Sequence, residues 1–281
     1  MTSLQDKGDK YFLGHSSTEQ RRLQQQAAEL AADSIWLFDQ LRLSPGCRVV
    51  EIGCGPQGCL QILAERVGRA GSVVGVEVSE DAVALARAFV AQHQLGCVEV
   101  RHGDAKATGL PRSTFDLATA RLVLINVPEP EAIVAEMAAL VKPGGVVALH
   151  ESDWEMVLCD PPLPAWNRMI QAFLEYSRVH AIDPSIGRRI ARLLRANGLT
   201  DIRINPFIHV YDVKNPRRTL LSQFAGNLRD RILANGIMTG DEFEGCRESI
   251  ERHLADPDTV VMWPHFQAWG TKPQARHMPG E

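Results

Sequence analysis

Short apolar runs alternate with amphipathic stretches along the first half of the chain. The apolar runs have the length and composition of buried strands, and the stretches between them carry apolar residues at helical spacing. We therefore predict strands at 48–52, 72–78, 98–102, 115–120 and 146–149, and helices at 18–41, 60–67, 80–92 and 129–141. Near-continuous apolar strands separated by helices predict an α/β fold in which a parallel, doubly wound sheet is covered on both faces.

The pattern changes after Glu151. Prolines at positions 161, 162 and 164 interrupt the chain. The remaining sequence predicts helices at 165–178, 185–197, 217–233 and 241–254, with strands at 201–211 and 259–269. We expect the two late strands to join the edge of the same sheet and the inserted helices to cover its carboxyl edge.

Composition excludes several classes of protein. The 281 residues are 45% apolar and 23% charged, with a formal net charge of −4, so nothing favours a nucleic acid or an anionic membrane as partner. None of the six cysteines has the C-x-x-C spacing of a zinc or redox site. The first residues are polar, and no apolar run is long enough to span a bilayer. We expect a soluble, cytoplasmic protein with free thiols.

A glycine-rich loop follows the first predicted strand and opens a helix. Gly53, Gly55 and Gly58 fit the spacing G-x-G-x-x-G, which lets backbone approach a ligand but serves several nucleotide-type cofactors. Glu51 lies two residues before the first glycine. Its carboxylate would repel a pyrophosphate and attract the sulfonium and ammonium groups of S-adenosylmethionine. The alternative is that Glu51 only caps a helix.

Two further acidic residues lie at strand ends. Glu77 ends the second strand, where a carboxylate can accept hydrogen bonds from both ribose hydroxyls, although an exposed strand-end glutamate without a ligand would look the same. Asp104 follows the third strand, where it can receive an adenine amino group or act as a turn residue.

Five motifs in order resemble those of class I S-adenosylmethionine-dependent methyltransferases of the small-molecule, secondary-metabolite type. They are Glu51–Gly55, Val76–Ser79, Gly103–Ala105, Phe115–Ala118 and Pro143–Gly145. The resemblance implies a seven-stranded Rossmann-like sheet whose last strand is antiparallel, with inserted lid helices. It implies a single domain over 1–281, made of an N-terminal helical cap (1–42), a cofactor-binding core (43–153) and a C-terminal part (154–281) with the covering helices and the last two strands.

The same resemblance implies the cofactor site. The segment from Tyr11 to Leu23 is similar to one that closes over the cofactor, with Tyr11 and Arg22 in contact. The other implied S-adenosylmethionine ligands are Glu51, Gly53, Cys54, Gly55, Gly58, Glu77, Val78, Asp104, Ala105, Arg121 and Leu122. Asn126 departs from the pattern, because many relatives carry histidine there. No Asn-Pro-Pro-Tyr or Asp-Pro-Pro-Tyr follows the fourth strand, which disfavours DNA bases and glutamine as acceptors.

Methyl transfer from a sulfonium is an in-line displacement that needs alignment, exclusion of water and, for some acceptors, a base. No metal is required. We predict His150 as the base, since it lies just past the fifth strand, with His15 and Asp153 as further catalytic candidates. A strand-end histidine satisfied by backbone is the alternative for His150. The sequence around His265 indicates a core or lid position.

The predicted substrate-binding residues lie mainly on the inserted segments, where plain packing is the alternative. They are Asn126, Trp154, Phe173, Tyr176, Phe224, Asn227 and Arg231. This apolar cover predicts a small aromatic acceptor, methylated on carbon, nitrogen or oxygen; the indole carbon of a tryptophan-derived diketopiperazine is one possibility. A nicotinamide-dependent oxidoreductase and a catalytically silent S-adenosylmethionine-binding protein are the alternatives. We expect a monomer or homodimer that does not bind nucleic acid or membrane.

Overall fold

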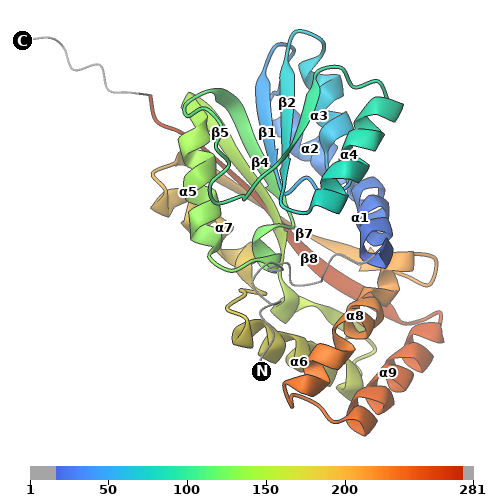
Figure 1. The fold of residues 1–281 in the computed structure, drawn as a ribbon. Helices are drawn as coiled ribbons and strands as arrows, with labels where there is room; N and C mark the ends of the chain where they lie inside the picture. Colours follow the sequence, from blue (N-terminus) through green and yellow to red (C-terminus); the bar gives the residue numbers. More distant parts are fainter. Residues whose placement is uncertain (1–16, 275–281) are drawn as a thin grey trace, which may run out of the picture.

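The computed structural model describes residues 17–274, which are built around one mixed eight-stranded sheet (Figure 1). The strands are β1 (Arg48–Ile52), β2 (Ser72–Glu77), β3 (Val98–His102), β4 (Phe115–Arg121), β5 (Val141–Ser152), β6 (Leu158–Asp160), β7 (Thr200–Tyr211) and β8 (Val260–Thr271). Their order is β3-β2-β1-β4-β5-β8-β6, and β7 also pairs with β8. Strands β1 to β5 are parallel, whereas β8 is antiparallel to all three of its neighbours.

The short strand β6 explains why eight strands fill seven positions. β5 pairs with His265–Thr271 of β8, and β6 pairs with Val260–Met262 of the same strand. β7 pairs with β8 along both of these stretches, so β5 and β6 lie one after the other on its opposite side. The predicted seven-stranded, mostly parallel sheet with an antiparallel last strand is confirmed, and β6 continues the position of β5.

Helices cover both faces of the sheet, as the alternating pattern predicted. On one face α2 (Ala31–Gln40), α3 (Leu60–Val67) and α4 (Glu80–Gln92) form a core with side chains that include Val49, Val73 and Leu117. On the other face α5 (Pro130–Leu140) and α7 (Ile190–Ala196) pack over Val50, Ile52 and Ala118. Successive residues of β1 and β4 therefore serve opposite cores, which is the period-2 alternation of a strand buried on both sides.

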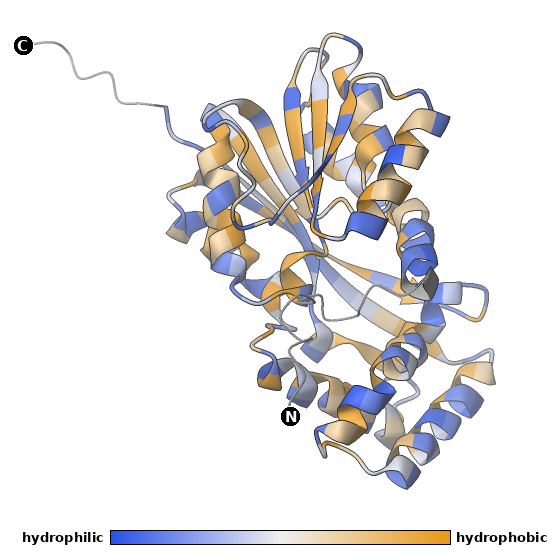
Figure 2. Ribbon diagram, viewed as in Figure 1, coloured by the Kyte–Doolittle hydropathy of each residue, from blue (hydrophilic) through white to orange (hydrophobic). Residues whose placement is uncertain are grey.

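Four more helices lie past the carboxyl ends of the parallel strands (Figure 1). They are α1 (Ser17–Glu29), α6 (Pro164–Val179), α8 (Leu220–Ala234) and α9 (Gly240–Ala255). In Figure 2 the parallel strands are mainly apolar and α9 mainly polar, and α9 buries only Phe243, Ile250 and Leu254. Single 3₁₀ turns occur at Leu124–Asn126, Trp154–Met156, Ile186–Arg189 and Pro216–Thr219. No helix of the described residues is long and apolar enough to cross a membrane.

One predicted helix is two helices in the structure. The stretch predicted as 18–41 divides at Leu30, which is left outside both α1 and α2. The Leu30 carbonyl still accepts a hydrogen bond from Ser34 within α2, and it also faces Arg121 Nη1 at 3.4 Å. Periodicity alone missed this break because apolar residues continue at helical spacing through it.

Candidate active site

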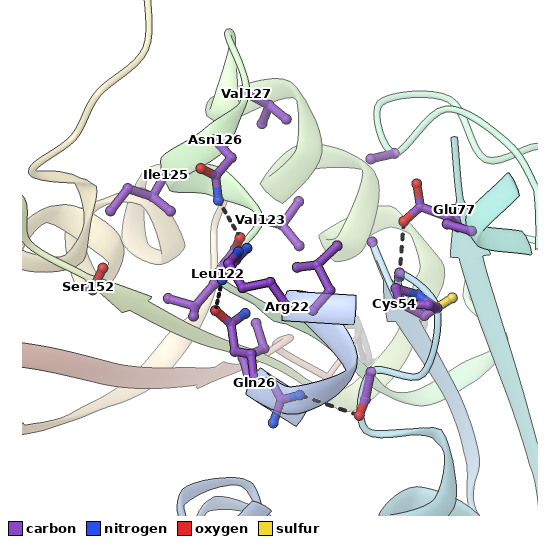
Figure 3. A pocket seen from close by; sticks show the side chains of 18 of the residues that line it. Arg22, Gln26, Cys54, Glu77, Leu122, Val123, Ile125, Asn126, Val127 and Ser152 are labelled. Carbon is purple, nitrogen blue, oxygen red and sulfur yellow. Dashed lines mark hydrogen bonds between the residues drawn. The ribbon is translucent and has the colours of Figure 1, made fainter. Parts of the chain in front are cut away.

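A cavity opens at the carboxyl ends of β1, β2 and β4, where the strand order of the sheet reverses. Ligands bind at this switch point in doubly wound sheets. The empty space is about 1280 Å³, and this volume includes open solvent at the mouth. Figure 3 shows Glu77 and Cys54 on one side, Ile125 and Ser152 on the other, and Arg22 and Gln26 of α1 across the cavity.

The glycine loop connects β1 to α3 with three left-handed residues. Gly53, Gly55 and Gly58 have φ values of +64°, +55° and +51°. A Cβ on Gly58 would lie 2.7 Å from Glu51 Oε1, whereas a Cβ on Gly55 would meet nothing within 4 Å. The loop therefore passes tightly over the Glu51 carboxylate and leaves open space beside Gly55, as a cradle for a ligand requires.

Glu51 lies at the bottom of this loop with 2% of its surface exposed. Both carboxylate oxygens accept a hydrogen bond from the backbone nitrogen of Cys59, at 2.8 and 3.0 Å. Burial raises the pKa of Glu51 to about 7, and the Arg121 guanidinium opposes that rise. Glu51 thus caps the start of α3 and also lines the cavity.

Glu77 also lines the cavity, and its carboxylate is held by backbone. Oε2 accepts from the nitrogen of Gly55 at 3.0 Å, and Oε1 accepts from the nitrogens of Val78 and Ser79 at 2.9 Å each. The carboxylate therefore fixes the glycine loop against the end of β2. Oε2, which accepts only one of these bonds, retains capacity to accept a further hydrogen bond from a ligand hydroxyl.

Asp104 does not line the cavity, contrary to the sequence-based prediction. Its side chain is exposed, and Oδ1 accepts from the nitrogen of Lys106 at 2.9 Å. Its carbonyl accepts from Ala107 at 3.0 Å, so Asp104 is the turn residue that the alternative described. Gly103 and Ala105, on either side of it, line the cavity instead.

Arg121 and Leu122 continue the wall at the end of β4. Arg121 donates to Ser34 Oγ at 2.8 Å and to the Gly58 carbonyl at 3.3 Å, which joins α2 to the glycine loop. Leu122 has φ +54° although it is not glycine. Asn126, which also lines the cavity, donates from Nδ2 to the Leu122 carbonyl at 2.8 Å.

Glu151 was missed by sequence reasoning. Its side chain is fully buried and accepts hydrogen bonds from the nitrogens of Val123, Leu124 and Ile125 at 3.0, 2.8 and 3.3 Å. Burial raises its pKa to about 8. The signal available in the sequence was an acidic residue at the second-last position of a buried strand. Glu151 holds in place the segment that carries Leu122 and Asn126.

Four aromatic side chains form the opposite wall. Trp154 stacks on Phe173 with ring centroids 4.0 Å apart, and it meets Phe224 and Trp263 edge-on at 5.2 and 4.7 Å. All four rings line the cavity. Trp154, Phe173 and Phe224 were predicted, whereas Trp263 was not. Its sequence context, Trp-Pro-His-Phe, had indicated only a core or lid position.

Three predicted substrate residues do not line the cavity. Tyr176 is 3% exposed and its ring packs on His180 at 4.1 Å. Asn227 and Arg231 lie on α8 and do not line the cavity. Helical spacing grouped them with Phe224, but only one stripe of α8 faces the cavity.

Two of the three predicted catalytic residues, His150 and Asp153, do not line the cavity. His150 is 1% exposed and does not line the cavity; its Nε2 is 3.0 Å from His265 Nδ1. Asp153 is buried and forms an ion pair with Arg188, which holds it away from the cavity. His265 lines the cavity in their place. The cause is the pairing of β5 with β8, which the local sequence does not reveal.

Part of the predicted closing segment can be located. Arg22 lines the cavity, with its guanidinium 4.9 Å above the Phe224 ring and Nη1 donating to Gln26 at 2.8 Å (Figure 3). Tyr11 and His15 lie outside the described residues. Within residues 17–274, no group of three or more histidine, cysteine or acidic side chains is arranged to hold a metal ion.

Comparisons with known proteins agree with this geometry. Residues 50–149 match a family model described as a methyltransferase domain. Demethylmenaquinone methyltransferase of Listeria monocytogenes serotype 4a is 30% identical over 136 residues, covering 48% of this chain and 55% of the relative. Nocamycin O-methyltransferase of Saccharothrix syringae is 36% identical over 113 residues, covering 40% of each chain. The chain thus spans about half the length of the curated relatives it matches.

A solved structure is similar over most of the chain. Phosphoethanolamine N-methyltransferase 2 of Haemonchus contortus, bound to S-adenosylhomocysteine, aligns with a TM-score of 0.53 and 18% identity, covering 86% of this chain and 53% of that one. At that identity the likeness concerns the fold. None of these matches favours a nicotinamide oxidoreductase. Residues 50–149 are a methyltransferase domain, and the chain shares its fold with this solved methyltransferase.

Proposed function

We propose that this protein transfers a methyl group from S-adenosylmethionine to a small aromatic acceptor, of the kind found among secondary metabolites. One observation carries the proposal: a single cavity has carboxylates and a glycine loop at one end and four aromatic rings at the other. The first end suits a cationic nucleoside, and the second suits a flat apolar molecule. The indole carbon of a diketopiperazine is one acceptor of this class.

The cofactor end fits S-adenosylmethionine in charge and in space. The buried Glu51 carboxyl would attract its sulfonium and ammonium groups, and Glu77 Oε2 would accept from a ribose hydroxyl. The open space beside Gly55 admits ligand atoms that a side chain would displace. When bound, the cofactor supplies an electrophilic methyl on a good leaving group.

The acceptor end supplies contact area with little charge. Trp154, Phe173, Phe224 and Trp263 offer ring faces and edges, with which a planar acceptor can stack or meet edge-on. The rings would hold the acceptor beside the cofactor and exclude water, which is the main task of the protein in such a displacement. The named relatives, which include an O-methyltransferase and a demethylmenaquinone methyltransferase, support a small molecule as acceptor.

The first test is titration calorimetry with S-adenosylhomocysteine, comparing the wild type with Glu77→Ala and with the control Glu80→Ala. Glu80 is exposed at the start of α4 and does not line the cavity, so its removal leaves the affinity unchanged. Loss of a charged hydrogen-bond acceptor costs about 1.5–3 kcal/mol, so Glu77→Ala weakens binding roughly tenfold or more. No binding by a wild type that is folded by circular dichroism would refute the proposal.

The second test is a screen for acceptors. Incubation with S-adenosylmethionine and a panel of indoles, phenols and aromatic amines, followed by mass spectrometry, gives a product one methyl heavier. Methylation confined to protein or nucleic acid would refute the small-molecule acceptor. Tight binding of S-adenosylhomocysteine without methyl transfer to any class of acceptor would favour a catalytically silent binding protein. Binding of a nicotinamide cofactor instead would favour the oxidoreductase.

A further inference from the structure

Ser152 supplies the sole side-chain hydroxyl among the described residues that line the cavity (Figure 3). It is the last residue of β5, and only 4% of its surface is exposed. Among the described residues, no group forms a hydrogen bond with Ser152 Oγ. The oxygen is nevertheless not one of the fully enclosed atoms that lack a partner, so it keeps some accessible surface. Because the residue is buried on its other sides, that surface faces the cavity.

Other polar side chains of the cavity already have partners within the protein. Asn126 donates to the Leu122 carbonyl, and Gln26 accepts from Arg22, each at 2.8 Å. A ligand that fills the cavity displaces solvent from the Ser152 hydroxyl. That ligand has to form a hydrogen bond in return, because a polar group left buried without a partner costs free energy.

On one side, contacts connect Ser152 to the cofactor end of the cavity. The preceding residue, Glu151, accepts a hydrogen bond from the backbone nitrogen of Val123 at 3.0 Å. Val123 in turn packs against the glycine loop, since a Cβ on Gly53 would lie 2.6 Å from Val123 Cγ2. Ser152 is therefore one residue away from a side chain that holds the segment packed on the cofactor loop.

On the other side, Ser152 adjoins the aromatic wall. It lies opposite His265 in the pairing of β5 with β8, and Trp263 follows on the same face of β8, two residues from His265. Trp154 comes two residues after Ser152 along the chain. Ser152 thus lies between the two ends of the cavity, where a methyl group would pass from the cofactor to the acceptor.

The backbone of Ser152 is held in place by a close contact. Gly187, in the 3₁₀ turn Ile186–Arg189, approaches it so tightly that a Cβ on Gly187 would lie 2.6 Å from the Ser152 carbonyl oxygen. A serine side chain has a single rotatable bond before its oxygen. On a fixed backbone it therefore offers Oγ in few positions, as a residue that orients a ligand requires.

Resting on the proposed function, we propose that Ser152 Oγ accepts a hydrogen bond from the O–H or N–H group of the aromatic acceptor, and that Ser152 is a specificity-determining residue. The hydroxyl accepts with a lone pair and keeps its own proton. The rings of the wall contact the flat part of the acceptor, and Ser152 fixes its rotation between them. Phenols, aromatic amines and indoles satisfy the hydroxyl, whereas an aromatic hydrocarbon of the same shape leaves it unpaired.

The test is a thermodynamic cycle measured by equilibrium dialysis in the presence of saturating S-adenosylhomocysteine. The polar ligands are 2-naphthol, 2-naphthylamine and indole. Each is paired with a hydrocarbon of similar shape that lacks the O–H or N–H group, naphthalene for the first two and indene for the third. Ser152→Ala should weaken the binding of at least one polar ligand about threefold to tenfold, the contribution of a neutral hydrogen bond. Its affinity for the paired hydrocarbon should change less than twofold.

Ser44→Ala is the matched control, since Ser44 is exposed and does not line the cavity, and it should leave every affinity unchanged. An equal loss for a polar ligand and its hydrocarbon would reveal a purely structural role for Ser152, and no loss for any polar ligand would show that the hydroxyl is not used. Either result would overturn the inference. If the wild type binds S-adenosylhomocysteine but none of the aromatic compounds, the proposed aromatic acceptor is itself refuted, and the inference with it.

Discussion

The glycine loop allows steric overlap to be separated from backbone strain by two matched substitutions. Gly55 and Gly58 both have a positive φ, so an alanine at either position costs roughly 1–2 kcal/mol of strain. At Gly58 the new Cβ would also lie 2.6 Å from the Cys54 carbonyl oxygen and 2.7 Å from Glu51 Oε1. Such overlap in a packed site adds about 1–3 kcal/mol. Gly58→Ala should therefore lower the free energy of unfolding by about 2–5 kcal/mol, and Gly55→Ala by about 1–2 kcal/mol.

Urea denaturation of the ligand-free variants, followed by circular dichroism, measures both values. Calorimetry then compares the affinities of the two variants for S-adenosylhomocysteine. Gly55→Ala places a methyl group in the open space of the cavity, so its affinity should fall although most of its stability is retained. Equal destabilisation by the two substitutions, or undiminished affinity in Gly55→Ala, would show that this loop does not pass over Glu51 and the ligand as described.

Three further outcomes follow from the charges and thiols. The pKa of Glu51 is raised to about 7, so its carboxyl is neutral below that pH. The affinity for S-adenosylmethionine, measured by calorimetry, should therefore fall up to tenfold for each pH unit below 7. Glu51→Gln should remove this pH dependence. Arg188→Ala removes the ion-pair partner of the buried Asp153 and should lower the free energy of unfolding in urea by about 1–3 kcal/mol. The control Arg192→Ala removes an exposed arginine and should change it by close to zero. A change near zero for Arg188→Ala would contradict the prediction. Cys59 is buried with a pKa near 12, so iodoacetamide should modify it only after unfolding, and its labelling in the folded protein, seen by mass spectrometry, would show that the site is open.

The local sequence was enough to predict the elements whose boundaries depend on neighbouring residues. β1, β3, α3 and α4 begin and end where periodicity placed them, because each is bounded by glycine, serine or a polar turn. The glycine loop was recognised because its spacing and its glutamate lie within eight residues. Its conformation follows from positive φ values that glycine adopts without strain.

The rest depends on strand pairing between distant segments. His265 lies 115 positions after His150, and only the register of β5 with β8 brings the two rings together. Asp153 was placed near the cavity because nothing in its neighbourhood reveals Arg188, which comes from a later segment. Asp104 illustrates a different failure, since a short aspartate after a strand satisfies its own turn as readily as a ligand.

The two walls of the cavity come from separate stretches of the chain. The cofactor wall is formed mainly by residues between 51 and 127, and the aromatic wall by residues between 152 and 265. The family model ends at residue 149, before the second wall begins. Substitutions can therefore vary the aromatic wall while residues 51–127 are left intact. Libraries aimed at new acceptors should be confined to the second wall.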